Sequence, residues 1–317
     1  MHRRKFLLWG QSLIERGAWF LAPISLVWAA VVFCKNFLYR NRLLKAHCVD
    51  PCVISVGNIV AGGTGKTPFV HLLATVFSHR KIAILSRGYG EVPDEAILLQ
   101  RRLPNAKVYI GRDRVALARL AAKAGAEIII LDDGLQHRRL HRDIEVILLR
   151  GEDPFGRGHF LPWGFLRDTP KRLQEADAVF FSGQDIVSVP TRILGVHGKT
   201  LDSIQGMRVG LFCGIANPRS FKKIIEGLGG EIAFEWILAD HEAALAGPLK
   251  KFSDRCHQGG AKILVTTEKD FVKLPCLDSE ILPIFYVEIE ARVATGNRTW
   301  ENLIAKIDRK IENRAAL

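Results

Sequence analysis

The 317-residue chain has few cysteines, and its six cysteines are scattered along the sequence. They form neither a Cys-x-x-Cys pair nor a cluster with histidines at the spacing of zinc ligands, so we expect reduced thiols and no structural zinc. The sequence also lacks internal repeats and low-complexity tracts. Its 48% hydrophobic and 25% charged residues therefore indicate a globular chain, long enough for one large domain or two.

Acidic residues are scarce at the start of the chain. The net charge is +12, and residues 1–45 contribute much of it, because eight lysines and arginines there stand against Glu15 alone. The same segment holds an uncharged run, residues 17–34. As a helix this run would be about 27 Å long, slightly less than the roughly 30 Å hydrocarbon core of a bilayer. Pro23 within it would be expected to kink the helix.

Four interpretations of this N-terminal segment compete: a cleaved signal peptide, a membrane span, a buried core helix, and a retained helix on the cytoplasmic leaflet. A signal peptide conflicts with the nucleotide-binding pattern that follows, and basic residues on both sides leave a span without a clear orientation. Three tryptophans, Trp9, Trp19 and Trp28, suit a membrane interface better than a core. We therefore favour a retained, membrane-associating helix whose cationic flanks attract anionic lipid. No basic surface interleaved with aromatic residues follows, so nucleic acid is not an expected partner.

Beyond residue 45, short β-branched runs alternate with helix-like stretches. Residues 52–58, 81–88 and 127–134 are examples of continuous apolar strands. Such strands, separated by helices, are typical of a parallel sheet whose two faces are both covered. We therefore predict an α/β fold in which a P-loop NTPase-like parallel sheet carries helices on both faces.

A second series of strands and helices follows a polar, turn-rich stretch near residues 190–206. The sequence thus predicts three parts: a membrane-associating segment at 1–45, a P-loop kinase domain at 46–200, and a second, smaller α/β domain at 201–317. The residues from Thr299 onward are expected to form a closing helix.

The stretch GNIVAGGTGKTP, residues 57–68, lies between a predicted strand and a predicted helix. Its GTGKT tail matches a phosphate-binding loop, although Val60 and Ala61 depart from the two usual forms of that motif. Lys66 would place its charge on the β- and γ-phosphates, and Thr67 would offer a hydroxyl to Mg²⁺. The expected nucleotide-binding residues are Gly62, Gly63, Thr64, Gly65, Lys66 and Thr67.

The run EIIILDDGLQH, residues 127–137, predicts a strand that ends in two acidic residues. Asp132 and Asp133 would stand at the carboxyl end of that strand, where ligands bind in α/β sheets, with Gln136 on the same loop. These side chains could hold Mg²⁺ beside the P-loop, although a turn with two capping aspartates is the alternative. The run VTTEKD, residues 265–270, does not match the guanine-binding pattern N-K-x-D, so ATP is the expected nucleotide.

Several motifs occur in one order along the chain: GNIVAGGTGKTP, SRGYG (86–90), LDDGLQHRRLHRD (131–143), LPWGFLRD (161–168), ADH (239–241) and TTEKD (266–270). Together they resemble the tetraacyldisaccharide 4'-kinase family, the lipid A 4'-kinases of Gram-negative envelopes, over essentially the whole chain. The resemblance implies ATP- and Mg²⁺-dependent transfer of the γ-phosphoryl group to the 4'-hydroxyl of a tetraacylated glucosamine disaccharide 1-phosphate. It also implies two α/β domains with the active site between them.

The same resemblance implies where the protein works and with what partners. Its substrate would be a membrane-embedded glycolipid, met at the cytoplasmic face of the inner membrane. No obligate protein partner is evident in the sequence.

The resemblance also assigns catalytic residues. Asp94 matches the family's catalytic aspartate and His241 its histidine partner, a pair suited to taking the proton of a sugar hydroxyl. Because the two fall in different predicted domains, domain closure would bring them together. The family's G-D-E-P is here P-D-E-A, residues 93–96, so Glu95 is the alternative base.

Further residues complete the expected site. Lys66 and Arg114 join the catalytic set, because Arg114 matches a family arginine near the phosphates; a salt bridge at a helix start is the alternative role. Asp168, beside Arg167, matches the acidic member of a family Arg-Glu pair. The expected metal ligands are Thr67, Asp132, Asp133, Gln136 and Asp168.

The competing function is a P-loop switch or metallochaperone ATPase or GTPase at the membrane. Such a protein would need a metal-binding His/Cys run or a guanine motif, and the sequence has neither. Dependence of phosphoryl transfer on a lipid disaccharide would separate the two functions.

Overall fold

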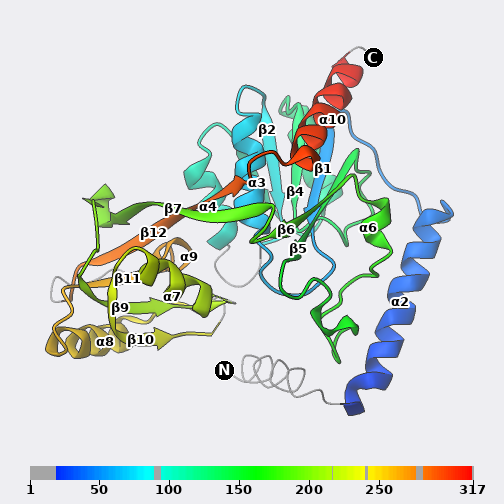
Figure 1. The fold of residues 1–317 in the computed structure, drawn as a ribbon. Helices are drawn as coiled ribbons and strands as arrows, with labels where there is room; N and C mark the ends of the chain where they lie inside the picture. Colours follow the sequence, from blue (N-terminus) through cyan, green and yellow to red (C-terminus); the bar gives the residue numbers. More distant parts are fainter. Residues whose placement is uncertain (1–18, 89–93, 216, 240–241, 276–280, 316–317) are drawn as a thin grey trace. The chain divides into compact units, whose positions relative to one another are not determined.

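The computed structural model describes residues 19–88, 94–215, 217–239, 242–275 and 281–315 (Figure 1). Contacts within the chain divide it into two compact units. Unit 1 comprises Met1–Gly88, Leu99–Val187 and Ala291–Leu317, and unit 2 comprises Tyr89–Leu98 and Ser188–Glu290.

Unit 1 is built on a parallel sheet with the strand order β6-β5-β1-β4-β2-β3. The strands are β1 (Cys52–Gly57), β2 (Ile82–Ser86), β3 (Lys107–Ile110), β4 (Ile128–Asp132), β5 (Ile144–Arg150) and β6 (Ala178–Ser182). Every residue of β1, β2 and β4 is buried, because a central parallel strand is covered on both faces. The register places Val56 of β1 opposite Asp132 of β4, so the loops after these two strands start side by side.

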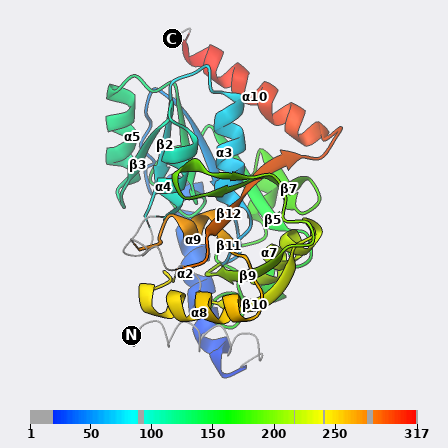
Figure 2. The same cartoon turned by 90° about the vertical axis from the view of Figure 1, so that its left-hand side faces the viewer.

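Helices cover both faces of this sheet, as the sequence predicted (Figure 2). They are α3 (Lys66–Val76), α4 (Asp94–Arg102), α5 (Arg114–Lys123), α6 (Arg172–Glu175) and α10 (Arg298–Ala315). Strand side chains alternate between the faces: Ile54 joins a core with Phe69 of α3, whereas Val53 joins a core with Val115 of α5. Each such apolar side chain contributes about 1.5–3 kcal/mol when fully buried.

Unit 2 is a smaller α/β unit with the strand order β10-β9-β11-β12-β7 and with β8 antiparallel to β7. Its strands are β7 (Ile186–Gly195), β8 (Thr200–Leu201), β9 (Arg208–Cys213), β10 (Glu231–Ile237), β11 (Ile263–Thr267) and β12 (Ile284–Val293). Its helices are α7 (Pro218–Gly227), α8 (Ala246–Gln258) and α9 (Glu268–Phe271). Phe221 of α7 and Phe252 of α8 belong to two different hydrophobic cores, so this sheet is also covered on both faces.

The two units differ from the predicted domains in how the chain is shared between them. The chain leaves unit 1 at the start of β7 and returns to it near the end of β12, instead of dividing once near residue 200. The last helix, α10, belongs to unit 1 because its apolar side chains Leu303, Ile307 and Ile311 pack in the core of that unit. Local sequence patterns identify a helix, but they do not show which sheet it will cover.

The apolar N-terminal run forms a helix, as expected. A short turn, η1 (Trp19–Leu21), leads into α2 (Ala22–Arg40), which lies along one side of unit 1 (Figure 1). Pro23 does not kink the helix, because it stands in the first turn, where a missing N–H breaks no helical hydrogen bond. By length and composition the 22-residue stretch Trp19–Arg40 could cross a membrane.

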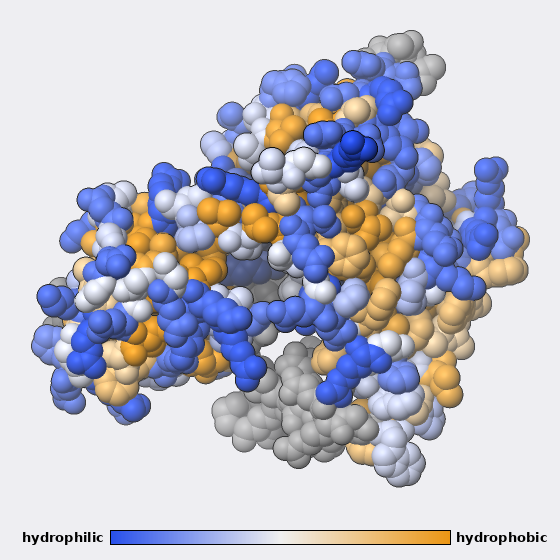
Figure 3. Space-filling view, viewed as in Figure 1, coloured by the Kyte–Doolittle hydropathy of each residue, from blue (hydrophilic) through white to orange (hydrophobic). Residues whose placement is uncertain are grey.

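The outer face of α2 is strongly apolar. Only Ser25 and Val32 of this helix are buried, and Figure 3 shows apolar side chains along its visible face. The large apolar residues exposed on η1 and α2 are Trp19, Phe20, Ile24, Leu26, Val27, Trp28, Val31, Phe33 and Phe37. A contiguous exposed surface of this kind marks a membrane or protein contact.

Helix α10 also contacts the segment that leads into the first strand, β1. Arg314 Nη1 lies 2.6–2.7 Å from the carbonyl oxygens of residues 49–51, and its Nη2 lies 2.6 Å from Asp143 Oδ1. The other oxygen of Asp143 accepts a hydrogen bond from Val53 N in β1. One guanidinium therefore joins the last helix to the first strand.

The substitution Arg314→Ala is expected to lower the free energy of unfolding by about 2 kcal/mol, because it leaves the Asp143 carboxylate without its cation. Urea unfolding measures this loss. Arg309→Ala is the matched control on the same helix, since Arg309 is exposed and bonds only to its own helical turn at Ala305 O among the described residues. Equal midpoints for the two variants would contradict the role given to Arg314.

Candidate functional site

The loop between β1 and α3, residues 58–65, has the backbone of a phosphate-binding loop. Gly62 has φ 102° and Gly65 has φ 78°, and both values lie in the region that favours glycine. Gly65 is the N-cap of α3, and within the part of the chain that the structure describes no side chain caps this helix. Its first N–H groups and the positive end of its dipole therefore point toward the place where an anion would bind.

Asn58 is the centre of the hydrogen bonds that shape this loop. It is fully buried, and its Nδ2 donates to Thr64 Oγ1 at 3.1 Å and to Gly62 O at 3.4 Å. Its carbonyl oxygen accepts from Gln136 Nε2 at 3.0 Å, and its Oδ1 accepts from Arg167 at 3.3 Å. Asn58 thus joins the P-loop to the acidic loop after β4 through its main-chain carbonyl, and to the segment around residue 167 through its side chain.

The acidic loop carries a cluster of charges beside the P-loop. Arg167 forms a bidentate salt bridge with Asp133, with N···O distances of 3.2 and 3.0 Å. It also donates a hydrogen bond to Gln136 Oε1 at 2.8 Å. Lys66 Nζ lies 3.7 Å from Asp133 Oδ1. The sequence predictions for Lys66, Asp133 and Gln136 therefore fall on one contiguous cluster, and Asp133 holds both cations in place.

Asp132 and Arg114 lie deeper in the same region. Asp132 is the last residue of β4 and is 2% exposed; Arg114, the first residue of α5, is 3% exposed. Arg114 Nη2 donates to the carbonyl oxygen of Asp132 at 3.2 Å, and Asp113 caps the helix by accepting from two backbone N–H groups. The structure thus places Arg114 at the acidic strand end, where it is buried and supports the backbone of Asp132. Its role near the phosphates stays a prediction.

His137 shares this buried environment. Burial, and after it the positive charge of Arg114, lowers the pKa of His137 to about 4. Its imidazole is therefore neutral near pH 7, and it does not add to the positive charge around the acidic loop.

Arg150 is a site residue that the sequence did not single out. It ends β5, and its Nε donates to Gly63 O at 3.2 Å. A Cβ atom on Gly62 would lie 2.4 Å from Arg150 Nη2, so the guanidinium passes directly over the glycine. The only signal in the sequence is a charged residue at the end of an otherwise apolar strand.

Asp168 has different neighbours from the other expected metal ligands. It is 3% exposed, and its Oδ1 accepts hydrogen bonds from Asn36 Nδ2 and from Thr169 N, both at 2.8 Å. The N–H groups of Arg167 and Asp168 both donate to Ile59 O, at 2.7 and 3.2 Å. Asp168 therefore holds the segment that fixes the P-loop, and its metal-ligand role stays a prediction.

The residues present fit Mg²⁺ as the metal. Among the described residues no group of three or more His, Cys, Asp or Glu side chains could hold a metal alone. Mg²⁺ does not need such a cage, because it is usually bound by one or two carboxylates together with substrate phosphates. The Thr67 hydroxyl at the start of α3 and the Asp132 carboxylate at the end of β4 are oxygen donors of that kind.

Asp94 and His241 are the predicted acid–base pair. His241 and the side chain of Asp94 lie outside the described residues. Asp94 begins α4, whose first residues, up to Leu98, belong to unit 2, whereas the sequence placed Asp94 in the first domain. Glu95, the alternative base, forms an ion pair with Lys269 of the TTEKD motif.

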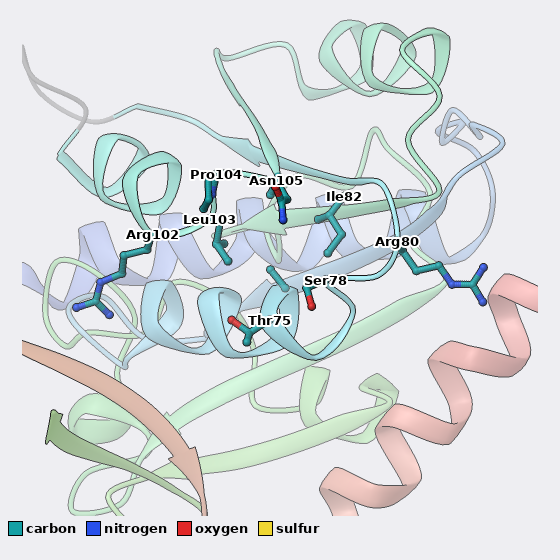
Figure 4. Close-up of a pocket in the computed structure, with 10 residues that line it drawn as sticks. Thr75, Ser78, Arg80, Ile82, Arg102, Leu103, Pro104 and Asn105 are labelled. Carbon is teal, nitrogen blue, oxygen red and sulfur yellow. The ribbon is translucent and has the colours of Figure 1, made fainter.

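One cavity of the described residues lies away from the P-loop. It has a volume of about 200 Å³ and lies between the end of α3 and the starts of β2 and β3, at the opposite edge of the sheet from the P-loop. Figure 4 shows Arg80 and Arg102 pointing away from it in opposite directions. It therefore has no concentration of charge, and the candidate site remains the carboxyl edge of the sheet.

Comparisons with known proteins agree on one family. A model of the tetraacyldisaccharide-1-P 4'-kinase family matches residues 17–93 and 90–308. The tetraacyldisaccharide 4'-kinase of Chlamydia abortus is 36% identical over 328 residues, covering 88% of this chain and 88% of that protein. The corresponding protein of Syntrophus aciditrophicus is 34% identical, covering 90% and 92%. A crystal structure described as the "apo" form of LpxK from Aquifex aeolicus in complex with ATP has a TM-score of 0.72 at 28% identity, over 90% of this chain and 98% of that one.

Proposed function

The chain belongs to the tetraacyldisaccharide 4'-kinase family, and from this membership we propose how its own residues carry out the reaction. It is an ATP-dependent kinase of lipid A biosynthesis. The γ-phosphoryl group is transferred to the 4'-hydroxyl of a tetraacyldisaccharide 1-phosphate. The competing function, a membrane switch or metallochaperone, is not favoured.

One observation supports this proposal more than any other. Through Asn58, Gln136 and Arg167, the acidic loop after β4 is hydrogen-bonded to the P-loop after β1. A phosphate cradle and a metal-holding carboxylate are the two parts that phosphoryl transfer from ATP requires next to each other. The network holds the two parts next to each other.

The P-loop residues bind the triphosphate. The backbone N–H groups of Gly62, Gly63, Thr64, Gly65, Lys66 and Thr67 surround the phosphate oxygens, with the α3 dipole behind them. The Lys66 ammonium group, which lies beside Asp133, pairs instead with the β- and γ-phosphates of the bound nucleotide. Arg150 adds a second positive charge beside Gly62. Arg114 acts from behind as a positioning residue, because its buried guanidinium holds the backbone of Asp132.

Mg²⁺ would be held by Thr67 and Asp132, with Asp133 and Gln136 on the same side. When bound, it would supply neutralisation of the charge that develops on the phosphate oxygens. Asp133 and Gln136 are shared with Arg167, so this arginine sets how far the two side chains can move toward the ion.

Asp94, with His241 as its partner, takes the proton of the 4'-hydroxyl. A bond then forms between the 4'-oxygen and the γ-phosphorus, the bond from that phosphorus to the β,γ-bridging oxygen breaks, and ADP leaves. The products are the 4'-phosphorylated glycolipid and ADP, and the proton remains on the Asp94–His241 pair until it is released to water. A carboxylate next to an imidazole is suited to this step at neutral pH.

Helix α2 brings the enzyme to its substrate at the cytoplasmic face of the inner membrane. A tetraacylated substrate stays in the bilayer, because each buried CH₂ group contributes about 0.8 kcal/mol to its insertion. The exposed apolar face of α2 and the basic flanks give the protein affinity for the same surface.

Deletion of residues 1–34 is expected to lower the affinity of the protein for anionic vesicles by about tenfold or more, because it removes most of that apolar face. Binding of a fluorescent ATP analogue should be retained, since no P-loop residue is removed. Vesicle co-sedimentation and a nucleotide titration measure the two properties. Persistent vesicle binding would show that the anchor lies elsewhere in the chain.

The function itself is tested by incubating the purified full-length protein with γ-³²P-labelled ATP and a panel of lipid A precursors in mixed micelles. Label is expected on the 4'-position of the tetraacylated disaccharide 1-phosphate. A monosaccharide precursor and a disaccharide already phosphorylated at the 4'-position are the negative controls. Hydrolysis of ATP without transfer to any glycolipid would refute the proposal.

A further inference from the structure

Helix α2 has two different surfaces, an exposed apolar one and a polar one that contacts other parts of the protein. Its large apolar side chains are exposed, but Lys35, Asn36 and Tyr39 contact other segments of unit 1. Their spacing places these three on one side of a helix with 3.6 residues per turn. We call this set the polar seam of α2.

The side-chain polar contacts of the polar seam reach two loops of the candidate site, the acidic loop and the segment around Asp168. Lys35 Nζ donates to the carbonyl oxygen of Gln136 at 2.7 Å. The Tyr39 ring lies 5.6 Å from the Arg138 guanidinium. Asn36 lies between the two loops: its Oδ1 accepts from Arg138 Nη1 at 2.8 Å and its Nδ2 donates to Asp168 Oδ1 at 2.8 Å.

Asn36 is chemically suited to this bridge. An amide can accept from a guanidinium and donate to a carboxylate at the same time, which neither a carboxylate nor an apolar side chain can do. Because Asp168 is almost fully buried, its oxygen has no ready replacement for the hydrogen bond.

The two partners of Asn36 lead directly to the nucleotide loops. Arg138 closes the acidic loop, in which the Gln136 side chain bonds to Asn58 and Arg167. Asp168 follows Arg167, whose guanidinium holds Asp133, and its own N–H donates to Ile59 O at the base of the P-loop. The polar seam is thus connected to both sides of the phosphate site through short chains of hydrogen bonds.

We propose that Asn36 is a positioning residue of the kinase site, so that the seating of the membrane helix sets the geometry of the acidic loop as well as the location of the protein. This inference rests on the proposed function for its kinetic readout. Asp168 fixes the position of Asn36 by accepting its hydrogen bond. Helix α2 therefore helps to position the residues of the kinase site.

The test uses full-length protein with Asn36→Ala and two controls on the same helix. Ser25→Ala removes the hydrogen bond from Ser25 Oγ to Phe160 O, a contact between α2 and a segment of unit 1 outside the acidic loop. Phe37→Ala removes an apolar side chain that is 60% exposed and belongs to the exposed apolar surface of α2. Each variant is measured for vesicle co-sedimentation, urea unfolding, and kcat and KM with ATP and glycolipid.

Asn36→Ala is expected to lower kcat by about tenfold or more, with vesicle binding, the urea midpoint and KM for the glycolipid close to wild type. Ser25→Ala should keep kcat within about twofold, and Phe37→Ala should weaken vesicle binding without lowering kcat at saturating glycolipid. If Asn36→Ala keeps its kcat, or if Ser25→Ala loses as much, α2 is an anchor only and the proposal is overturned.

A second pair of variants covers the case in which Asn36→Ala is poorly folded. Asn36→Asp places a carboxylate against Asp168 and should lower kcat at least as much. Adding Asp168→Asn restores an amide–carboxylate pair in reverse order, so the double variant should recover most of the lost kcat. A double variant as inactive as Asn36→Asp would mean that Asp168 acts independently of Asn36, and would overturn the coupling.

Amide hydrogen exchange separates this inference from the proposed function. Asn36→Ala should speed exchange in residues 133–138 and 165–168, whatever the protein phosphorylates. Faster exchange in these residues, with no glycolipid labelled by the wild type, would refute the kinase activity and support the positioning role. Unchanged exchange in Asn36→Ala, with a wild type that labels the glycolipid, would support the kinase activity and refute the positioning role.

Discussion

Replacing Lys66 with alanine is expected to lower kcat for glycolipid phosphorylation by about 1,000-fold, because it removes the positive charge that the P-loop places on the β- and γ-phosphates. Lys66 stands at the first position of α3, 15% exposed, and its Nζ is held 3.7 Å from Asp133. The loss should therefore appear in the chemical step as well as in ATP affinity. Initial rates over a range of ATP concentrations separate the two.

Two further variants make this prediction specific. Lys66→Arg keeps a charge but cannot keep the position of a compact ammonium group, so it should remain strongly impaired. Lys81→Ala is the control, since Lys81 is an exposed lysine on the same unit that lies before β2 and far from the P-loop in the fold. Activity near wild type in Lys66→Ala would remove the assignment of residues 62–67 as a phosphate-binding loop.

Asp94→Ala is expected to lower kcat by about 100- to 10,000-fold, the usual range for loss of a general base, with a small change in KM for ATP. Asp94 is proposed to take the proton of the 4'-hydroxyl, which matters only in the transition state. Measuring kcat across pH should also show the loss of an ionisation that the wild type requires in its deprotonated form.

Glu95→Gln is the matched control for Asp94. Glu95 forms an ion pair with Lys269 in unit 2, which gives its carboxylate a structural role. We therefore expect Glu95→Gln to retain most of its kcat and to lose some stability. If instead Glu95→Gln is the inactive variant and Asp94→Ala is active, the base is one position further along the chain.

The sequence was sufficient for the parts of the site that depend on neighbouring residues. A P-loop is a strand, a glycine-rich turn and a helix start, and all three lie within residues 52–76, so the pattern predicts the geometry. The same holds for Asp132 and Asp133, which lie at the end of an apolar strand. The apolar, basic-flanked start of the chain likewise predicted a helix without showing what its polar residues would contact.

The remaining parts of the site depend on contacts between distant segments. Asn58, Arg150 and Asn36 each bond to residues far away in the sequence: Asn58 to Gln136, Arg150 to Gly63, and Asn36 to Asp168. None of these residues belongs to a periodic pattern, and a lone polar residue after a strand or within an apolar helix has several possible roles. Only the fold shows which partner each one has.

The return of α10 to unit 1 has a consequence for biosynthesis. Its residues Leu303, Ile307 and Ile311 complete a core whose other members begin at Cys52. On the ribosome, which adds about 5–20 residues per second, residues 188–290 emerge whole before α10 does. Residues 188–290 can thus reach their native packing first, while the nucleotide-binding unit still lacks the helix that completes its core.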